Sequence, residues 1–338
     1  MRKIYNEDDD EMTKLSAWLV AGVVQAGLVL PALAADIELR LAHVTSESSP
    51  IQAAALEYAR RVSERTNGAV EISVFAGAQL GSNAEVYEQV NLGAPIIQIA
   101  DPGYLSDYAP DFGVLAGPYL MSDPNDFSKL LESDLYAGMK DKVRESGNFE
   151  VLTMNWLYGA RHIISNRPVK DMNSTDGLAI RVPPNTMWIE TFKAMGADGI
   201  QIAWSEVYTG LSSGVVDAAE APLSAIVGAK LYENAKHISL TGHFNAFIGP
   251  IMNAELFASY PENVQAALIE ESVAAGEFMT KMVMESDGEY RDQLEAEGVA
   301  FHEDVDIAGF QAATTSVYEQ FPGWTPGLYD QVRAILDK

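Results

Sequence analysis

From residue 36 onward, short apolar runs alternate with longer amphipathic segments. Ile37–His43 and Val70–Phe75 alternate apolar and polar residues, which is typical of β-strands. The segment from Pro50 to about Arg65 carries its apolar side chains on one side, so we expect a helix there. A second helix over 84–92 leads to a third strand over 95–100. This β-α-β-α-β order predicts an open parallel or mixed α/β sheet.

A second run of the same kind begins near Leu157. Two α/β lobes in one chain predict a clamshell of mixed sheets flanked by helices, with a ligand between the lobes. In such sheets ligands bind beyond the carboxyl ends of the strands. The predicted elements of the second run are strands over 161–166, 178–182, 200–204 and 215–220, and helices over 186–195 and 205–214.

A long helix is predicted between Pro261 and about Glu297. The segment contains no proline and no breaking turn apart from Gly276 and Gly288, and its apolar residues lie on one side. At 1.5 Å per residue it would extend about 50 Å, which is longer than one lobe is wide. We therefore expect it to brace both lobes. Two C-terminal helices, over 307–320 and 328–336, complete the chain.

The N-terminus has the pattern of a signal peptide. Leu15–Leu30 is an uncharged apolar run, and Ala32-Leu33-Ala34 provides the small residues that suit signal peptidase. A membrane-spanning helix would need about 20 apolar residues. The acidic segment Asn6–Glu11 is a poor start for a signal peptide, so we expect translation to begin at Met12 and residues 1–34 to be removed. An uncleaved membrane anchor is the alternative. We expect the mature protein to be soluble outside the inner membrane.

Composition narrows the classes of partner. The 338 residues suffice for two domains, and 48% hydrophobic with 21% charged residues is typical of a soluble globular protein. A formal net charge of −26 argues against nucleic acid as a partner, but a small anion can still bind where the local field opposes the global one. The absence of cysteine excludes disulfides, a thiolate nucleophile and a cysteine metal site.

Two arginines are the first candidates for binding chemistry. Arg161 begins one predicted strand, and Arg181 lies inside another that reads as buried. A buried guanidinium needs an anionic partner, and its planar fork matches a carboxylate with two parallel hydrogen bonds. Both forks facing the gap between the lobes would make an anion receptor. The alternative is that each arginine pairs with an aspartate or glutamate of the chain itself.

Catalytic and cofactor motifs are not supported. Gly210–Gly214 fits G-x-S-x-G, but a hydrolase elbow needs the order strand, turn, helix, and here the serine ends a helix that precedes a strand. No H-E-x-x-H, Walker loop or G-x-G-x-x-G occurs. The acidic clusters at 122–126 and 303–306 are better interpreted as helix N-caps than as calcium loops. We therefore expect no catalytic residue, no cofactor and no metal ion.

Six short motifs occur in a recognisable order. They are Phe75–Gly81 (with Ala76 where a proline is usual), Pro118–Met121, Gly159-Ala160-Arg161, Ile180-Arg181-Val182-Pro183, Ser205–Leu211 and Val216–Pro222. Together they resemble the DctP-like substrate-binding proteins of tripartite ATP-independent periplasmic (TRAP) transporters. The resemblance spans nearly all of the expected mature chain.

This resemblance implies a fold and a function. The fold would be the two-lobed periplasmic-binding-protein clamshell, with lobe I formed by 35–157 plus about 246–286 and lobe II by 158–245 plus about 287–338. The protein would be a monomeric periplasmic receptor, not an enzyme. It would bind a small organic acid through an arginine–carboxylate contact and deliver it to the membrane permease subunits. The alternatives are a receptor for an ATP-driven importer and a secreted enzyme that acts on sugar acids.

The resemblance also implies individual site residues. Arg181 resembles the family's carboxylate anchor and Arg161 its second cationic contact. Ala221 stands where several relatives have a ligand-contacting asparagine, and we expect His43 and Glu47 to lie at a solvated loop edge. For Trp156 and Trp204 the alternative is core packing, and for Glu220 a less favoured alternative is a metal bridge to the ligand. The further expected ligand contacts are Asp101, Trp204 and Glu220, with Asn155, Trp156 and Tyr158 lining the cleft near the hinge.

Overall fold

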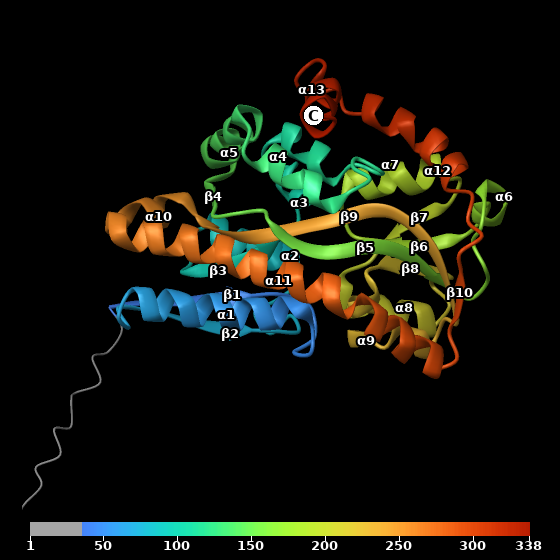
Figure 1. The fold of residues 1–338 in the computed structure, drawn as a ribbon, viewed down its shortest axis with the longest axis horizontal. Helices are drawn as coiled ribbons and strands as arrows, with labels where there is room; N and C mark the ends of the chain where they lie inside the picture. Colours follow the sequence, from blue (N-terminus) through green and yellow to red (C-terminus); the bar gives the residue numbers. More distant parts are fainter. Residues whose placement is uncertain (1–35) are drawn as a thin grey trace, which may run out of the picture. The chain divides into compact units, whose positions relative to one another are not determined.

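The computed structural model describes residues 36–338 (Figure 1). The predicted signal peptide and the start at Met12 therefore lie outside the described residues. Among the described helices, none is both long enough and apolar enough to cross a membrane. The described chain is built on a ten-stranded mixed sheet in the order β2-β1-β3-β9-β5-β8-β6-β7, with β4 and β10 paired to β9. Helices lie along the sheet, as expected for an α/β fold.

The first half-sheet consists of β1 (Ile37–Ala42), β2 (Val70–Phe75) and β3 (Ile96–Ala100). β1 lies in the middle and pairs parallel with both neighbours. The connecting helices α1 (Pro50–Arg65) and α2 (Asn83–Asn91) were predicted within a residue or two. Their starts have a local cause, because each is preceded by a serine whose hydroxyl caps the helix.

The second half-sheet has the same arrangement, with its first strand in the middle. β6 (Ala179–Val182) pairs parallel with β8 (Ala218–Ala221) on one side and with β7 (Asp198–Gln201) on the other. The strand predicted over 200–204 ends at Gln201, and the one predicted over 215–220 begins three residues later than expected. The helices of this half are α7 (Thr186–Ala194), α8 (Val207–Ser212) and α9 (Leu223–Gly228).

Two long strands join the half-sheets. β5 (Trp156–Ser165) and β9 (His237–Asn253) run antiparallel to each other. Along one side β9 pairs with β3 and β10 (Ala300–His302); along the other it pairs with β4 (Phe149–Val151) and β5. Sequence analysis assigned no element to β9, because its apolar and polar residues do not alternate regularly.

The long helix is confirmed as α11 (Glu262–Ala296), which follows α10 (Ala254–Ser259). It lies against both α1 and β5 (Figure 1). Buried polar groups secure it, since the hydroxyl of Tyr58 donates to the carbonyl of Leu268 at 2.9 Å and the indole of Trp156 donates to the carbonyl of Ser272 at 2.8 Å.

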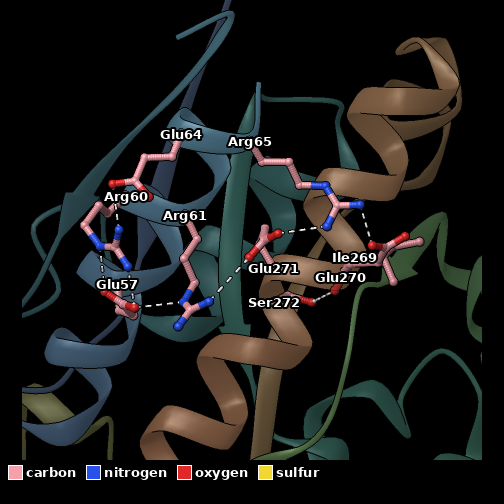
Figure 2. A network of polar contacts seen from close by, with 9 residues as sticks. All are labelled: Glu57, Arg60, Arg61, Glu64, Arg65, Ile269, Glu270, Glu271 and Ser272. Carbon is pink, nitrogen blue, oxygen red and sulfur yellow. Dashed lines mark hydrogen bonds and ion pairs between the residues drawn. The ribbon is translucent and has the colours of Figure 1, made fainter. Parts of the chain in front are cut away.

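An ion-pair network adds to this attachment on the surface (Figure 2). Arg61 and Arg65 of α1 both reach Glu271 of α11, at 3.8 Å and 2.8 Å. Arg65 also pairs with Glu270, and Arg61 with Glu57 on its own helix.

The remaining helices cover the sheet. α12 (Ile307–Thr314) is followed by a 3-10 turn that ends at Glu319, so the helix predicted over 307–320 has two parts. The others are α3 (Pro102–Leu105), α4 (Phe127–Leu131), α5 (Asp134–Gly147), α6 (Met172–Thr175) and α13 (Leu328–Leu336).

Candidate ligand-binding site

One cavity is lined from both half-sheets. His43 directly follows β1, Asp101 follows β3, Pro183 follows β6 and Ala221 ends β8, and all four contribute to the cavity wall. These are the carboxyl ends of the parallel strands, where open α/β sheets bind their ligands. The topology thus places the cavity where the strand pattern predicts a binding site.

Arg181 lies in this wall without an acidic partner. Its side chain, on β6, is 2% exposed, and its Nε donates to the carbonyl of Ile202 at 2.9 Å. Among the described residues it forms no ion pair, while the ring of Trp204 lies 5.3 Å from its Cζ. Burial lowers the pKa of Arg181 to about 10, so the guanidinium is still charged at neutral pH. A buried cation with unused donors is a site for an external anion.

Arg161, on β5, is neutralised within the protein. Its Nη2 lies 2.7 Å from Oε1 of Glu220 and its Nε lies 2.5 Å from Oε2. Nη2 also donates to the backbone carbonyl of Glu220 at 3.1 Å. Burial would raise the pKa of Glu220, but the charge and hydrogen bonds of Arg161 outweigh it and hold this pKa well below the usual value. The pair is therefore ionised.

His243 completes this buried group. Its Nε2 lies 3.3 Å from Oε2 of Glu220, and its Nδ1 lies 2.7 Å from the hydroxyl of Thr241. Burial lowers the pKa of His243. The neutral imidazole therefore donates from Nε2 to the carboxylate and accepts from Thr241 at Nδ1, which holds Glu220 in place against Arg161.

Asp101 contributes the acidic group of the cavity wall. It caps α3, with Oδ1 accepting from the backbone N–H of Gly103 at 2.8 Å. Burial raises the pKa of Asp101 to about 6, against the opposing effects of the Gly103 hydrogen bond and the charge of Arg161. At neutral pH it is an acceptor for hydroxyl groups.

Trp188, on α7, presents a polar atom without a partner. Its side chain is 2% exposed and lies in the cavity wall, with the ring 5.7 Å from Cζ of Arg161. Among the described residues its Nε1 has no hydrogen-bond acceptor. A buried indole N–H normally finds a partner, so this one is suited to a ligand oxygen.

α3 and α7 approach each other closely beside the cavity. A Cβ on Gly103 would lie 1.8 Å from Nδ2 of Asn185, the residue that caps α7, and 3.0 Å from a ring carbon of Trp188. Glycine is required for this approach. The contact joins a helix of the first half-sheet to a helix of the second beside the cavity.

His43 is a cavity residue that sequence analysis placed elsewhere. It is 3% exposed rather than at a solvated edge, with Nδ1 2.9 Å from the hydroxyl of Thr45 and Nε2 2.7 Å from Oε1 of Gln52. Its position directly after β1 was the signal that could have found it. Other polar or aromatic cavity residues that sequence analysis did not name as contacts are Thr45, Asn83, Tyr104 and Trp188.

Five of the eight predicted ligand contacts lie in the cavity wall: Arg181, Arg161, Asp101, Trp204 and Tyr158. The other three lie outside it. Glu220 is fully buried behind Arg161.

Asn155 and Trp156 face α11 instead of the cavity. Asn155 donates to the carbonyl of Val273 at 3.0 Å. Trp156 is fully buried in the core, which agrees with core packing, the alternative given for this residue. Among residues 36–338, no group of three or more histidine, aspartate or glutamate side chains is arranged to hold a metal ion.

Comparison with known proteins identifies the family. Residues 41–322 match the family described as bacterial extracellular solute-binding protein, family 7 (DctP). The chain belongs to this family. Family-7 proteins are periplasmic solute receptors of TRAP transporters and not enzymes, so the function class, the location and the absence of catalysis follow from membership.

Solved family-7 structures share the fold. A TRAP solute-binding protein from Ochrobacterium anthropi with bound L-fuconate is 33% identical with a TM-score of 0.86, covering 89% of this chain and 100% of that one. One from Actinobacillus succinogenes with bound L-galactonate is 31% identical with a TM-score of 0.86, covering 89% of this chain and 99% of that one.

A characterised relative is also similar in sequence. The 2,3-diketo-L-gulonate-binding periplasmic protein of Escherichia coli is 28% identical over 321 residues, which cover 94% of this chain and 96% of that one.

Proposed function

We propose that this family-7 receptor binds a sugar acid by its carboxylate, held on Arg181, and delivers it to a TRAP membrane permease. The observation that carries the proposal is the buried Arg181 fork, which has no acidic partner among the described residues. Removing a guanidinium from water without a counter-ion is costly, and a carboxylate supplies both the charge and the matching geometry.

The rest of the cavity suits a polyhydroxylated acid. Asp101 accepts hydrogen bonds from hydroxyl groups, the unpartnered Nε1 of Trp188 donates one, and the ring of Trp204 offers an apolar face to a carbon chain. The ligands named for the relatives, L-fuconate, L-galactonate and 2,3-diketo-L-gulonate, are acids with one carboxylate and several oxygen groups. They are the first compounds to test.

Closure of two lobes would couple binding to delivery. We place lobe I at 35–157 plus about 246–286 and lobe II at 158–245 plus about 287–338, so that the chain crosses between them in β5, β9 and α11. β5 has irregular pairing with β9 between Leu157 and Gly159, close to the first crossing. A ligand that touches both lobes only when they are closed shifts the population toward the closed state, which the permease can then recognise.

Substitution of Arg181 tests the proposal. Calorimetric titration with L-fuconate, L-galactonate and 2,3-diketo-L-gulonate identifies which acid binds. We expect Arg181→Ala to weaken that binding by about 2–5 kcal/mol, because one side of a buried charge pair is lost. Arg181→Lys should also bind poorly, because a lysine cannot provide the two-pronged contact.

The matched control is Arg60→Ala, since the side chain of Arg60 is 50% exposed on α1 and its ion-pair partners among the described residues are glutamates of its own helix. It should bind as the wild type does. Unchanged affinity in both Arg181 variants would reject the carboxylate anchor.

A further inference from the structure

Only a few charged groups meet at the cavity. Arg161, Arg181 and Asp101 lie in its wall, and Glu220 lies directly behind Arg161. No lysine lines the cavity in the described part of the chain. His43 adds no charge, because burial lowers its pKa and both of its ring nitrogens are already hydrogen-bonded to Thr45 and Gln52.

Arg161 does not provide a second counter-ion. Its Nε and Nη2 are both directed at Glu220, which is fully buried and held from its other side by His243. Separating such a pair would leave an uncompensated charge in the interior. Arg161 can still donate a hydrogen bond from Nη1, but its charge is already balanced. Among the residues that line the cavity in the described chain, Arg181 is therefore the cation left for a ligand.

Asp101 lines the same cavity as Arg161. Within residues 36–338 the carboxylate of Asp101 forms no ion pair; it accepts from the backbone N–H of Gly103, and the charges of Arg161 and Glu220 act on it in opposite directions. Once the ligand carboxylate is on Arg181, any second negative group of the ligand would share the cavity with Asp101. Two carboxylates without a cation between them repel, whereas a hydroxyl group donates to Asp101.

We infer that Asp101 and Glu220 restrict this receptor to acids that carry a single negative charge, with a hydroxyl group where a diacid would carry its second carboxylate. Aldonic acids fit this requirement, whereas the corresponding aldaric acids and phosphate monoesters do not. The inference rests on the proposed function, because it takes the first carboxylate to be held by Arg181.

Matched pairs of acids test the inference. L-galactonate and galactarate differ only in that a terminal CH₂OH is replaced by a carboxylate, and gluconate and glucarate form a second such pair. At pH 7.5 in low salt, calorimetry of the full mature chain should show the diacid binding about 30-fold or more weakly than its monoacid partner.

Asp101→Asn assigns the cause. Asparagine keeps the oxygen that accepts from Gly103, so the cap of α3 is preserved while the charge is removed. The variant should bind the diacid more tightly and reduce the ratio within each pair to about 5-fold or less. Asp306→Asn, at the exposed cap of α12, is the control and should leave the ratio unchanged. Asp101→Ser provides the same cap if the asparagine variant does not fold.

The outcomes separate the two claims. A wild-type protein that binds galactarate or glucarate as tightly as the monoacid partner overturns the inference and leaves the proposed function standing. Variants at Asp101 that weaken or strengthen both members of a pair equally also overturn it. If no monoacid or diacid in the panel, including L-fuconate, binds to the wild type, the sugar-acid function itself is rejected, and the inference with it.

Discussion

At the residue scale, Arg161 and Arg181 differ in what surrounds them rather than in chemistry. Both guanidiniums are buried and line the same cavity. Burial alone would lower the pKa of both arginines; for Arg161 the charge and hydrogen bonds of Glu220 outweigh burial and raise the pKa above its ordinary value, whereas for Arg181 burial prevails and lowers it. The internal carboxylate therefore makes Arg161 part of the scaffold, whereas Arg181 has no such partner among the described residues.

The charge of Asp101 should make stability depend on pH. Burial raises its pKa from 3.8 to about 6, so between these values the folded state holds a proton that the unfolded chain has lost. The free energy of unfolding therefore falls as pH rises through this window. Asp101→Asn removes the charge, so its free energy of unfolding should not fall in this way. The difference in free energy of unfolding between Asp101→Asn and wild type should therefore grow by about 2–3 kcal/mol from pH 4 to pH 7. Urea unfolding without ligand measures it.

Asp306→Asn again serves as the control, because it removes an exposed aspartate far from the cavity along the chain. An advantage of Asp101→Asn that stays constant with pH would mean that the carboxyl of Asp101 titrates normally.

At the element scale, the close approach of α3 and α7 depends on the missing side chain of Gly103. Gly103→Ala would place a methyl group against Asn185 and Trp188 and so hold the two half-sheets apart. We expect ligand affinity to fall about 10-fold or more, because only the closed state brings all contacts together.

Gly138→Ala is the matched control for this prediction. Gly138 lies inside α5, and an added Cβ there meets no atom within 4 Å, so ligand affinity should be unchanged. Equal affinity of Gly103→Ala and wild type would show that the approach of α3 to α7 is not needed for binding.

The attachment of α11 to α1 also belongs to this scale. The fully buried Tyr58 donates to the carbonyl of Leu268, whereas the arginine–glutamate pairs of Figure 2 are partly exposed. Tyr58→Phe should lower the free energy of unfolding by about 1 kcal/mol, the usual net value of one hydrogen bond. Glu271→Gln should cost less than about 1 kcal/mol, with its effect reduced by salt. Urea unfolding at two salt concentrations would check both predicted free energies. A larger loss of unfolding free energy for Glu271→Gln than for Tyr58→Phe would contradict the prediction that the buried hydrogen bond contributes more than the ion pair.

Local pattern was sufficient for part of the fold and of the site. The three strands of each half-sheet, the helices α1, α2, α7 and α8, the long helix α11 and the placement of Arg181 on a buried strand followed from periodicity and motifs, although β7 and β8 are displaced by two or three residues and α9 was not predicted. The inward position of Glu220 did not, because it depends on β8 pairing with β5 so that Glu220 stands opposite Ile163. Asn155 and Trp156 face α11 for a similar non-local reason, since their partners lie more than a hundred residues away.

At the scale of the whole described chain, no single cut in the sequence would separate the two half-sheets. β9 pairs with β3 at one end and with β10 at the other, so each half-sheet depends on segments from distant parts of the sequence. We expect residues 36–338 to unfold in a single cooperative transition. Calorimetry should give equal van't Hoff and calorimetric enthalpies, and two resolved transitions would contradict this expectation.

The continuity of β9 also has an evolutionary consequence. A receptor whose halves are each completed by the same strand cannot acquire a new specificity by exchanging one half as a module, because the exchange would cut that strand. The ability to bind a new ligand must instead arise by point substitutions in the cavity wall, at positions such as Asp101 and Ala221. Relatives with different cargoes should therefore keep the framework intact and diverge at a handful of side chains.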